Sequence, residues 1–261
     1  MEFLADTHIH VYPAHQPERL LDAAGQNLRR WAKTDNPDVG LFWVETAGLN
    51  TFESWYAGSV RLSNPFRIEP SHDSCSLQIV NDVTHHIIWC FAGRQIVTAE
   101  RLEILGLVMN GIIPDGLSAA DTIRRVLDVG GIPVLPWGLG KWLLGRSPVV
   151  KSVLDEFNAD QLWVGDNAMR PKGWFASAPL RDQNRRIIAG SDPLPMPSEE
   201  SMAGSYGTRF TGQIDPHAPS ESARTLLRCP PSDIERIGHR NHLLTTGRRM
   251  WHYRQRSAQG A

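Results

Sequence analysis

Segments with strand character alternate with segments of helical periodicity through the middle of the chain. Ser118 and Asp121 form a capping-box pattern ahead of a helix that ends at a glycine pair, and the apolar run IPVLPWG follows. Ser147-Pro148 begins a second helix, which leads to the strand-like runs QLWVGD and RRIIAGSD. Strands that alternate with helices are typical of βαβ units, so the sequence predicts an α/β chain with a mainly parallel sheet.

Polar residues recur directly after the apolar strand segments. They are His8, His10, Glu45, Asp166, Asn167, Ser191 and Asp192. Loops at the carboxyl ends of the strands of a parallel barrel converge on its axis, whereas an open sheet spreads such residues along a crevice. Because the pattern runs from the first strand to the last, we expect a distorted parallel (β/α)7-8 TIM-like barrel with a short C-terminal helical extension.

The 261 residues suffice for one large α/β domain or two smaller ones. We expect the barrel in residues 1–195, a lid or linker loop in the Pro-, Gly- and Ser-rich segment 196–221, and an Arg-rich C-terminal helical tail in 222–261. Ser232 and Glu235 form a capping-box pattern for the tail helix. Because the closing strand comes earlier, the tail is expected to be dispensable for the barrel.

The charge of the tail bears on possible partners. Eight Arg against two acidic residues give the tail a net charge of +6, while the whole chain carries −1. An Arg-rich tail can bind nucleic acid, but a solvated terminal helix is the commoner use of the pattern. Nucleic acid is therefore not an expected partner.

Other features of the composition suggest a location. Three widely spaced cysteines argue against a disulfide framework. No apolar stretch approaches the ~20 residues that span a bilayer, so no membrane partner is expected. With no secretory signal visible, a cytoplasmic location is expected. The oligomeric state is left open.

The first ten residues contain half of a candidate metal site. The stretch DTHIH places Asp6, His8 and His10 at alternating positions, and residues two apart on a strand point the same way. Two neutral imidazoles and one carboxylate, with positions open to water, suit Zn²⁺, Mn²⁺ or Fe²⁺. Asp192, in the stretch AGSD, is the second candidate carboxylate. Two alternatives stay open: the histidines are satisfied polar residues at a barrel mouth, and the Gly-Ser-Asp turn is a loop cap.

Several stretches resemble the polymerase-and-histidinol-phosphatase (PHP) branch of the amidohydrolase-like metal-dependent hydrolase barrels. They are DTHIH, AGRQIVTAERLEILGL, DGLSAADTIRRVLDVGGIPVL and IIAGSDPLP, and the resemblance covers residues 1–195. It implies that His8, His10 and Asp192 are metal ligands. It also implies that Asp192 is catalytic, accepting the proton of a metal-activated water.

The metal motif of this resemblance is degenerate. Gln95 stands where the family has a bridging Glu, and Pro136 and Trp137 stand where it has a His followed by Pro. No His follows Asp192. We therefore expect one divalent transition metal ion, or two at most, or none if the site has been lost.

Two functions follow from these observations. The first is a metal-dependent hydrolase that acts on a small anionic substrate, at a phosphoester or an amide bond. The second is a catalytically degenerate PHP-like barrel with a binding or scaffolding role. Metal content, and its loss in a His8→Ala variant, distinguishes the two.

Three basic residues form a candidate anion site. Lys141 and Arg146 lie in the glycine-rich run WGLGKWLLGR ahead of a helix, where backbone amides and the helix N-terminus favour an anion. Arg170 follows the next strand and is expected at the same barrel mouth. We predict that the three residues bind the substrate together. The alternative is that they form salt bridges with Asp166 and neighbouring loops.

Overall fold

The computed structural model describes residues 1–138, 142, 144–174 and 176–259. Within them, one sheet is built from β1 (Glu2–Ile9), β2 (Asp38–Glu45), β3 (Phe66–Pro70), β4 (Ser76–Asn81), β5 (Ile87–Val97), β6 (Glu103–Leu107), β7 (Ile132–Pro136), β8 (Trp163–Asn167), β9 (Ile187–Gly190), β10 (Tyr206–Thr211) and β11 (Ile234–Gly238). The helices are α1 (Pro17–Arg29), α2 (Thr51–Tyr56), α3 (Ala119–Asp128), α4 (Ser147–Glu156), α5 (Pro219–Leu227) and α6 (Leu243–Gln259).

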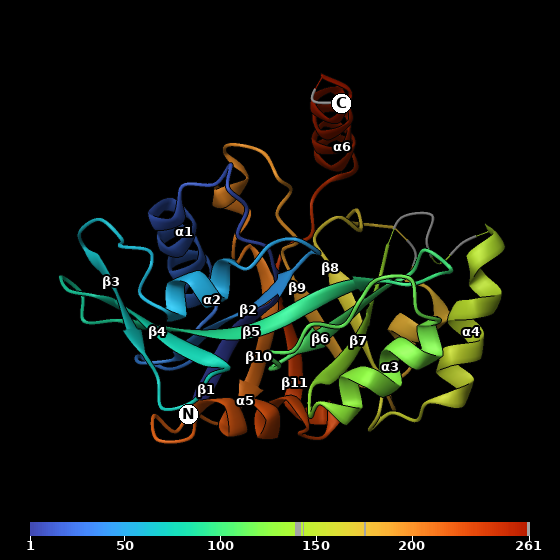
Figure 1. Ribbon diagram of the computed structural model, residues 1–261, viewed down its shortest axis with the longest axis horizontal. Coiled ribbons are helices and arrows are strands. Elements are labelled where there is room, and N and C mark those ends of the chain that lie inside the picture. The colour runs from blue at the N-terminus through green and yellow to red at the C-terminus, as the bar shows by residue number, and fades with distance from the viewer. Residues whose placement is uncertain (139–141, 143, 175, 260–261) are drawn as a thin grey trace.

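The sheet is a nearly closed, barrel-like surface with the strand order β11-β10-β1-β2-β5-β6-β7-β8-β9, and β3 and β4 pair beside β5 (Figure 1). It is mixed rather than mainly parallel, which corrects the expectation of a parallel TIM-like barrel. β1–β2, β2–β5, β7–β8 and β8–β9 are parallel, whereas β5–β6, β6–β7, β1–β10 and β10–β11 are antiparallel. The connection from β5 to β6 is too short for a crossover helix, so it forms a hairpin.

The two ends of this sheet meet through side chains rather than through a strand ladder. Thr208 Oγ1 on β10 accepts a hydrogen bond from the Ala189 backbone nitrogen on β9 at 2.7 Å. Thr7 Oγ1 on β1 donates to the Ala189 carbonyl at 2.9 Å. β9 is thereby fixed against β1 and β10, although the ladder partners of β1 are β2 and β10.

The barrel interior is an apolar core to which eight strands contribute. Phe3, Phe42, Phe91 and Phe210 pack face to edge or stacked, with the Phe42 and Phe91 ring centroids 5.0 Å apart. α5 adds Ala223, Leu226 and Leu227 to the same core and lies across the lower end of the barrel (Figure 1). Separate apolar clusters lie between the outer face of the sheet and the helices, one under α1 and another under α3 and α4.

β1 changes register at its carboxyl half, and this change positions the site. Its pairing with β2 is irregular between Asp6 and Ile9. Leu4 and Ile9 both pack in the cluster under α1, although residues five apart on a regular strand face opposite sides. The irregularity therefore turns His8 and His10 onto the interior side, as a β-bulge re-aims side chains.

The C-terminal third contributes to the sheet. The segment 196–221, predicted as a lid or linker, contains β10, and the segment 222–261 contains β11 as well as α6. Ser232 and Glu235 do not begin the predicted tail helix: Ser232 lies in a single 3-10 turn, Pro231–Asp233, Glu235 lies in β11, and α6 begins at Leu243. Whether the three segments fold as separate units stays a prediction, which truncation tests.

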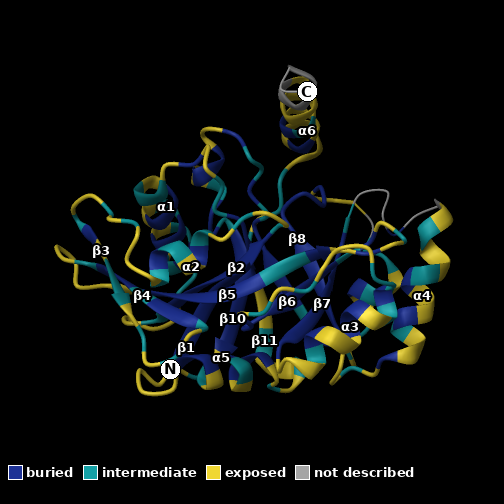
Figure 2. Ribbon diagram, in the orientation of Figure 1, coloured by how far each residue is buried: buried dark blue, intermediate teal, exposed yellow. Residues whose placement is uncertain are grey.

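α6 stands apart from the other helices at the top of Figure 1 and is mostly exposed in Figure 2, whereas most strands are buried, with β3 and β11 as exceptions. No helix among the described residues combines the length and apolarity that crossing a membrane requires.

Candidate metal centre

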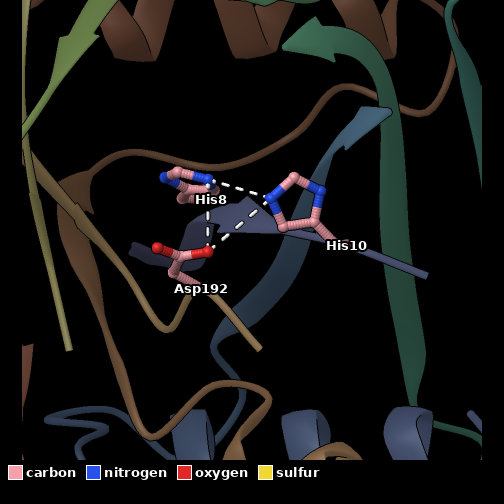
Figure 3. A group of neighbouring side chains, drawn as sticks. All are labelled: His8, His10 and Asp192. Carbon is pink, nitrogen blue, oxygen red and sulfur yellow. Dashed lines mark hydrogen bonds and ion pairs between the residues drawn. The ribbon is translucent and has the colours of Figure 1, made fainter. Parts of the chain in front are cut away.

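Three side chains from the two ends of the predicted barrel segment point toward one another at its mouth (Figure 3). His8 Nε2 lies 3.1 Å from His10 Nε2 and 3.6 Å from Asp192 Oδ1, and His10 Nε2 lies 3.7 Å from Asp192 Oδ1. Ligand atoms at ~2.1 Å from a tetrahedral Zn²⁺ lie about 3.4 Å from each other. The spacing and the chemistry of the three groups therefore fit one metal ion.

Asp192 reaches the histidines through an uncommon backbone conformation. Its φ of 51° is left-handed, and its backbone nitrogen donates to the His8 carbonyl at 2.9 Å. Asp adopts the left-handed backbone region more often than most other non-glycine residues do. Residues in this region cluster at functional sites. The turn after β9 therefore places the carboxylate directly over the end of β1.

Gly190 makes this close approach possible. A Cβ at this position would collide with the backbone nitrogen and Cβ of His8 and with Asp6 Oδ1. Only a residue without a side chain lets the end of β9 lie against β1 at this distance.

Asp6 supports the site and is not one of the converging ligands. Its carboxylate is fully buried and accepts hydrogen bonds from the backbone nitrogens of His8, Ser191 and Gly204 and from Ser191 Oγ. Burial raises its pKa to about 6, against the lowering effect of these hydrogen bonds. Asp6 thus links β1, the turn after β9 and the entry to β10, which corrects the expectation that it shares a face with both histidines.

The environment of His10 favours the neutral imidazole that a metal needs. Burial and the neighbouring His8 lower the pKa of His10 to about 3, although Asp192 and a hydrogen bond to the Val44 carbonyl raise it. With Nε2 facing His8 and Asp192, the bond to the carbonyl fixes the ring orientation, as outer-shell partners of ligating histidines do.

Asn167, at the end of β8, orients Asp192. Its Nδ2 donates to Asp192 Oδ2 at 2.9 Å and to the Trp137 carbonyl at 3.0 Å. Because both neighbouring oxygens are hydrogen-bond acceptors, the side-chain atom that faces them is the amide nitrogen and not the amide oxygen. Asn167 Oδ1 is buried and has no hydrogen-bond partner among the described atoms.

A cavity of about 290 Å³ opens beside these residues. Its walls come from the barrel mouth and from α6. Its lining is His10, Tyr12, Gln95, Glu103, Trp137, Gly138, Asn167, Met169, Asp192, Leu194, Pro195, Thr246, Met250 and Tyr253. Gln95, which stands where the family has a bridging Glu, thus borders the site with an amide in place of a carboxylate.

The predicted anion site is not assembled by its described members. Arg170 is buried and holds Asp166 with Nε at 2.7 Å and Nη2 at 2.5 Å, while Tyr206 and Arg236 bind the same carboxylate. Arg146 Nη1 donates to the Arg101 carbonyl at 2.8 Å. Neither Arg lines the cavity, because both guanidinium groups are engaged elsewhere. Lys141 lies outside the described residues.

Glu45 and Asp166, the other acidic residues that follow strands, have structural partners. Glu45 Oε1 accepts the backbone nitrogen of Phe52 at 3.0 Å, at the start of α2. Asp166 is committed to Arg170, Tyr206 and Arg236.

Sequence reasoning missed several residues around the site. Asn167 was noted among the polar residues near strand ends but was given no role, and its position was the available signal. No sequence pattern marks Tyr12, Glu103 or the α6 residues as part of the site, because only tertiary packing brings them to the cavity.

The comparisons with known proteins identify the fold. No model of a protein family matches the chain, and neither does a curated protein. Among solved structures, PsfC from Pseudomonas syringae PB-5123 is similar at 13% identity with a TM-score of 0.56, covering 100% of this chain and 99% of that one. The lesion-specific endonuclease PfuEndoQ from Pyrococcus furiosus is similar at 13% identity with a TM-score of 0.54, covering 87% of this chain and 56% of that one.

A third structure bears on the expected partners. Endonuclease Q in complex with a 27-mer duplex with an abasic lesion at the active site has 13% identity and a TM-score of 0.51, covering 87% of this chain and 57% of that one. A protein with a similar fold therefore takes nucleic acid into its active site, which overturns the expectation that nucleic acid is not a partner. At these identities, the likeness concerns the fold: the chain has a fold similar to that of PsfC and of about half of endonuclease Q.

Proposed function

We propose that this chain is a metal-dependent hydrolase of the PHP type that cleaves phosphoester bonds, with nucleic acid as the candidate substrate. The observation that carries the proposal is the convergence of His8, His10 and Asp192 at the barrel mouth, beside a cavity. The fold-level similarity to a lesion-specific endonuclease supports a phosphoester rather than an amide as the bond that is cleaved.

The chain's own residues divide the work at this site. His8 and His10 would hold the ion through Nε2, and Asp192 would hold it through Oδ1. Such an ion lowers the pKa of a water and polarises the bond under attack. Asn167 keeps Asp192 Oδ2 in place through its hydrogen bond at 2.9 Å. Asp192 borders the cavity, so it can also accept a proton there.

One observation favours a second candidate, a degenerate barrel that binds without catalysis. Gln95 lines the cavity where the PHP resemblance calls for a bridging Glu, and Pro136 stands where the resemblance calls for a His. With three converging ligands among the described residues, a single ion is the expected occupancy. Metal binding without turnover would be the signature of this alternative.

Metal analysis and a cleavage assay test the proposal together. The purified protein is expected to hold about one equivalent of Zn²⁺, Mn²⁺ or Fe²⁺ and to hydrolyse bis(p-nitrophenyl) phosphate or a labelled oligonucleotide with and without an abasic site. His8→Ala should lose both metal and turnover. His86→Ala, which removes an exposed histidine far along the chain from the site, is the matched control. Stoichiometric metal with no turnover of any phosphoester would contradict the hydrolase and favour the binding barrel.

A further inference from the structure

A second and larger cavity, of about 690 Å³, lies at the base of α6. We call it the cationic groove and define it by Arg30, Lys172 and Arg240, with His239 and His242 beside them. Its other lining residues are Asn27, Trp31, Met202, Ser205, Asn241 and Thr245, so no described Asp or Glu lines it.

The three cations of the groove have no carboxylate partner among the described residues. Arg30 Nη1 contacts Asn27 Oδ1 at 3.5 Å, and Arg240 Nη1 contacts the Pro171 carbonyl at 3.4 Å. Lys172 is exposed and is held through its backbone nitrogen, which donates to the Asn241 carbonyl at 2.7 Å. The guanidinium and ammonium groups are therefore available to an incoming anion.

Nearby arginines differ from these three. Arg170 and Arg236 bind Asp166, and Arg249 binds Glu199. Burial and the positive charges of Arg170 and Arg236 lower the pKa of Arg240, an effect that Asp166 only partly opposes. Among the described residues that line the groove, three are cationic and none is acidic, and a surface of this kind attracts polyanions.

The groove is next to the candidate metal centre. The end of β8 contributes Asn167 to the cavity at the metal ligands, and the loop after it contributes Met169 to that cavity and Lys172 to the groove. Likewise, α6 contributes Thr246 to that cavity and Thr245 to the groove. The two sites thus lie on different sides of one helix, whose diameter with side chains is ~10 Å.

An intermediate cavity of about 590 Å³ extends the positive surface along α6. It shares Met202 and Thr245 with the groove. It is also lined by Arg248 and His252 and by Glu199 and Arg249, which form an ion pair with each other. In the groove itself, the Trp31 and His239 rings meet edge to face, with their centroids 4.9 Å apart. Proteins that bind single-stranded nucleic acids combine aromatic rings, on which bases stack, with cationic side chains, which contact phosphates.

We propose that the cationic groove binds the phosphate backbone of a nucleic-acid strand. This proposal rests on the proposed function for the role of the strand, whose cleaved bond would lie at His8, His10 and Asp192. Arg30, Lys172 and Arg240 contact phosphates and so position the strand without reading its sequence.

Fluorescence anisotropy with labelled 20-nucleotide single strands and duplexes, in EDTA to prevent cleavage, tests the groove. The triple variant Arg30→Gln, Lys172→Gln, Arg240→Gln is expected to bind at least tenfold more weakly than the unchanged chain near 0.1 M salt. Each lost phosphate contact reduces the magnitude of the slope of log K against log salt by roughly 0.7–0.9, so the slope of the triple variant should be smaller by about 2.1–2.7. Binding should vary little with sequence.

The matched control removes three exposed arginines elsewhere: Arg61→Gln, Arg125→Gln, Arg181→Gln. It changes the net charge equally and should bind like the unchanged chain. Equal affinity of the two triple variants, with both showing the melting temperature of the unchanged chain, would contradict the proposal. So would the absence of oligonucleotide binding, including the case in which inorganic phosphate alone binds.

Failure of the groove and failure of the proposed hydrolase give different results. His8→Ala should bind oligonucleotides normally, because it leaves the groove intact, while it loses cleavage. Oligonucleotide binding that depends on the groove, without hydrolysis in Mn²⁺ or Zn²⁺, would support the groove and contradict the hydrolase. Hydrolysis of bis(p-nitrophenyl) phosphate without oligonucleotide binding would support the hydrolase and contradict the groove.

Discussion

Asn167 holds Asp192 by a hydrogen bond of 2.9 Å from its amide nitrogen to Oδ2, which leaves Oδ1 facing the two histidines. Asn167 is the last residue of β8, and Asp192 follows β9. The same amide nitrogen of Asn167 also donates to the Trp137 carbonyl, directly after β7. One side chain therefore joins the ends of three consecutive strands to the candidate ligand. The carboxylate is oriented before any ion binds.

Replacing Asn167 should weaken metal binding while the fold persists. Asn167→Ala removes the donor to Asp192, and loss of such a partner costs roughly 10–100-fold in metal affinity. Calorimetric titration of the metal-free protein with Zn²⁺ measures the change. Asn36→Ala, at an exposed position, is the control and should leave the affinity unchanged. An unchanged affinity in Asn167→Ala would show that Asp192 needs no such support.

A buried ion pair connects α6 to the site. Arg249 Nε lies 3.0 Å from Glu199 Oε1, and Arg249 Nη2 contacts both Glu199 Oε2 and, at 3.4 Å, the Asp192 carbonyl. Arg249→Ala leaves a buried carboxylate unpaired, which typically costs about 3–5 kcal/mol. We expect a lower melting temperature and faster proteolysis at the start of α6. Arg254→Ala, on the exposed part of the helix, is the control and should change neither the melting temperature nor the rate of proteolysis. If the two variants are cleaved at the same rate, Arg249 does not anchor α6.

The sequence was sufficient to predict that His8, His10 and Asp192 lie together, but by a route that differs from the observed one. Closure of a parallel barrel would make the first and last strands ladder partners. Instead, β1 pairs with β2 and β10, and β9 reaches β1 through Thr7 and the Asp192 backbone. The roles of the three residues stay predictions.

Four features could not be predicted from the local sequence pattern. The β-bulge after Asp6 depends on the strand beside it, so the alternation in DTHIH wrongly placed Asp6 with the histidines. β10 lies in a Pro-, Gly- and Ser-rich segment, and β11 resembles the start of a helix in its capping pattern. The ion pair between Arg170 and Asp166 depends on tertiary structure, so the sequence could not decide between the anion site and the salt-bridge alternative. The structure favours the salt bridge.

The close approach of β9 to β1 makes Gly190 a sensitive position. Gly190→Ala would force its Cβ against the His8 backbone and Asp6, and overpacking of this kind costs typically 1–3 kcal/mol. Because the displaced groups hold the ligands, metal affinity should fall along with the melting temperature. Gly145→Ala meets no atom within 4 Å and is the control. A Gly190→Ala protein that binds metal normally would show that the two strand ends are free to separate.

Two truncations should separate the contributions of α5 and β11 from that of α6. A chain ending at Ala218 loses Ala223, Leu226 and Leu227 from the barrel core, and it loses the strand that pairs with β10. Burial of each large aliphatic side chain contributes about 1.5–3 kcal/mol, so the loss approaches a typical net stability of ~5–15 kcal/mol. This chain should aggregate or lack a cooperative melt, against the sequence-based expectation of a dispensable tail. A chain ending at Asn241 keeps both elements and removes only α6, so it should melt cooperatively while its site is open to solvent. Thermal melts followed by circular dichroism compare the two, and a cooperative melt of the chain ending at Ala218 would show that the barrel folds without the tail.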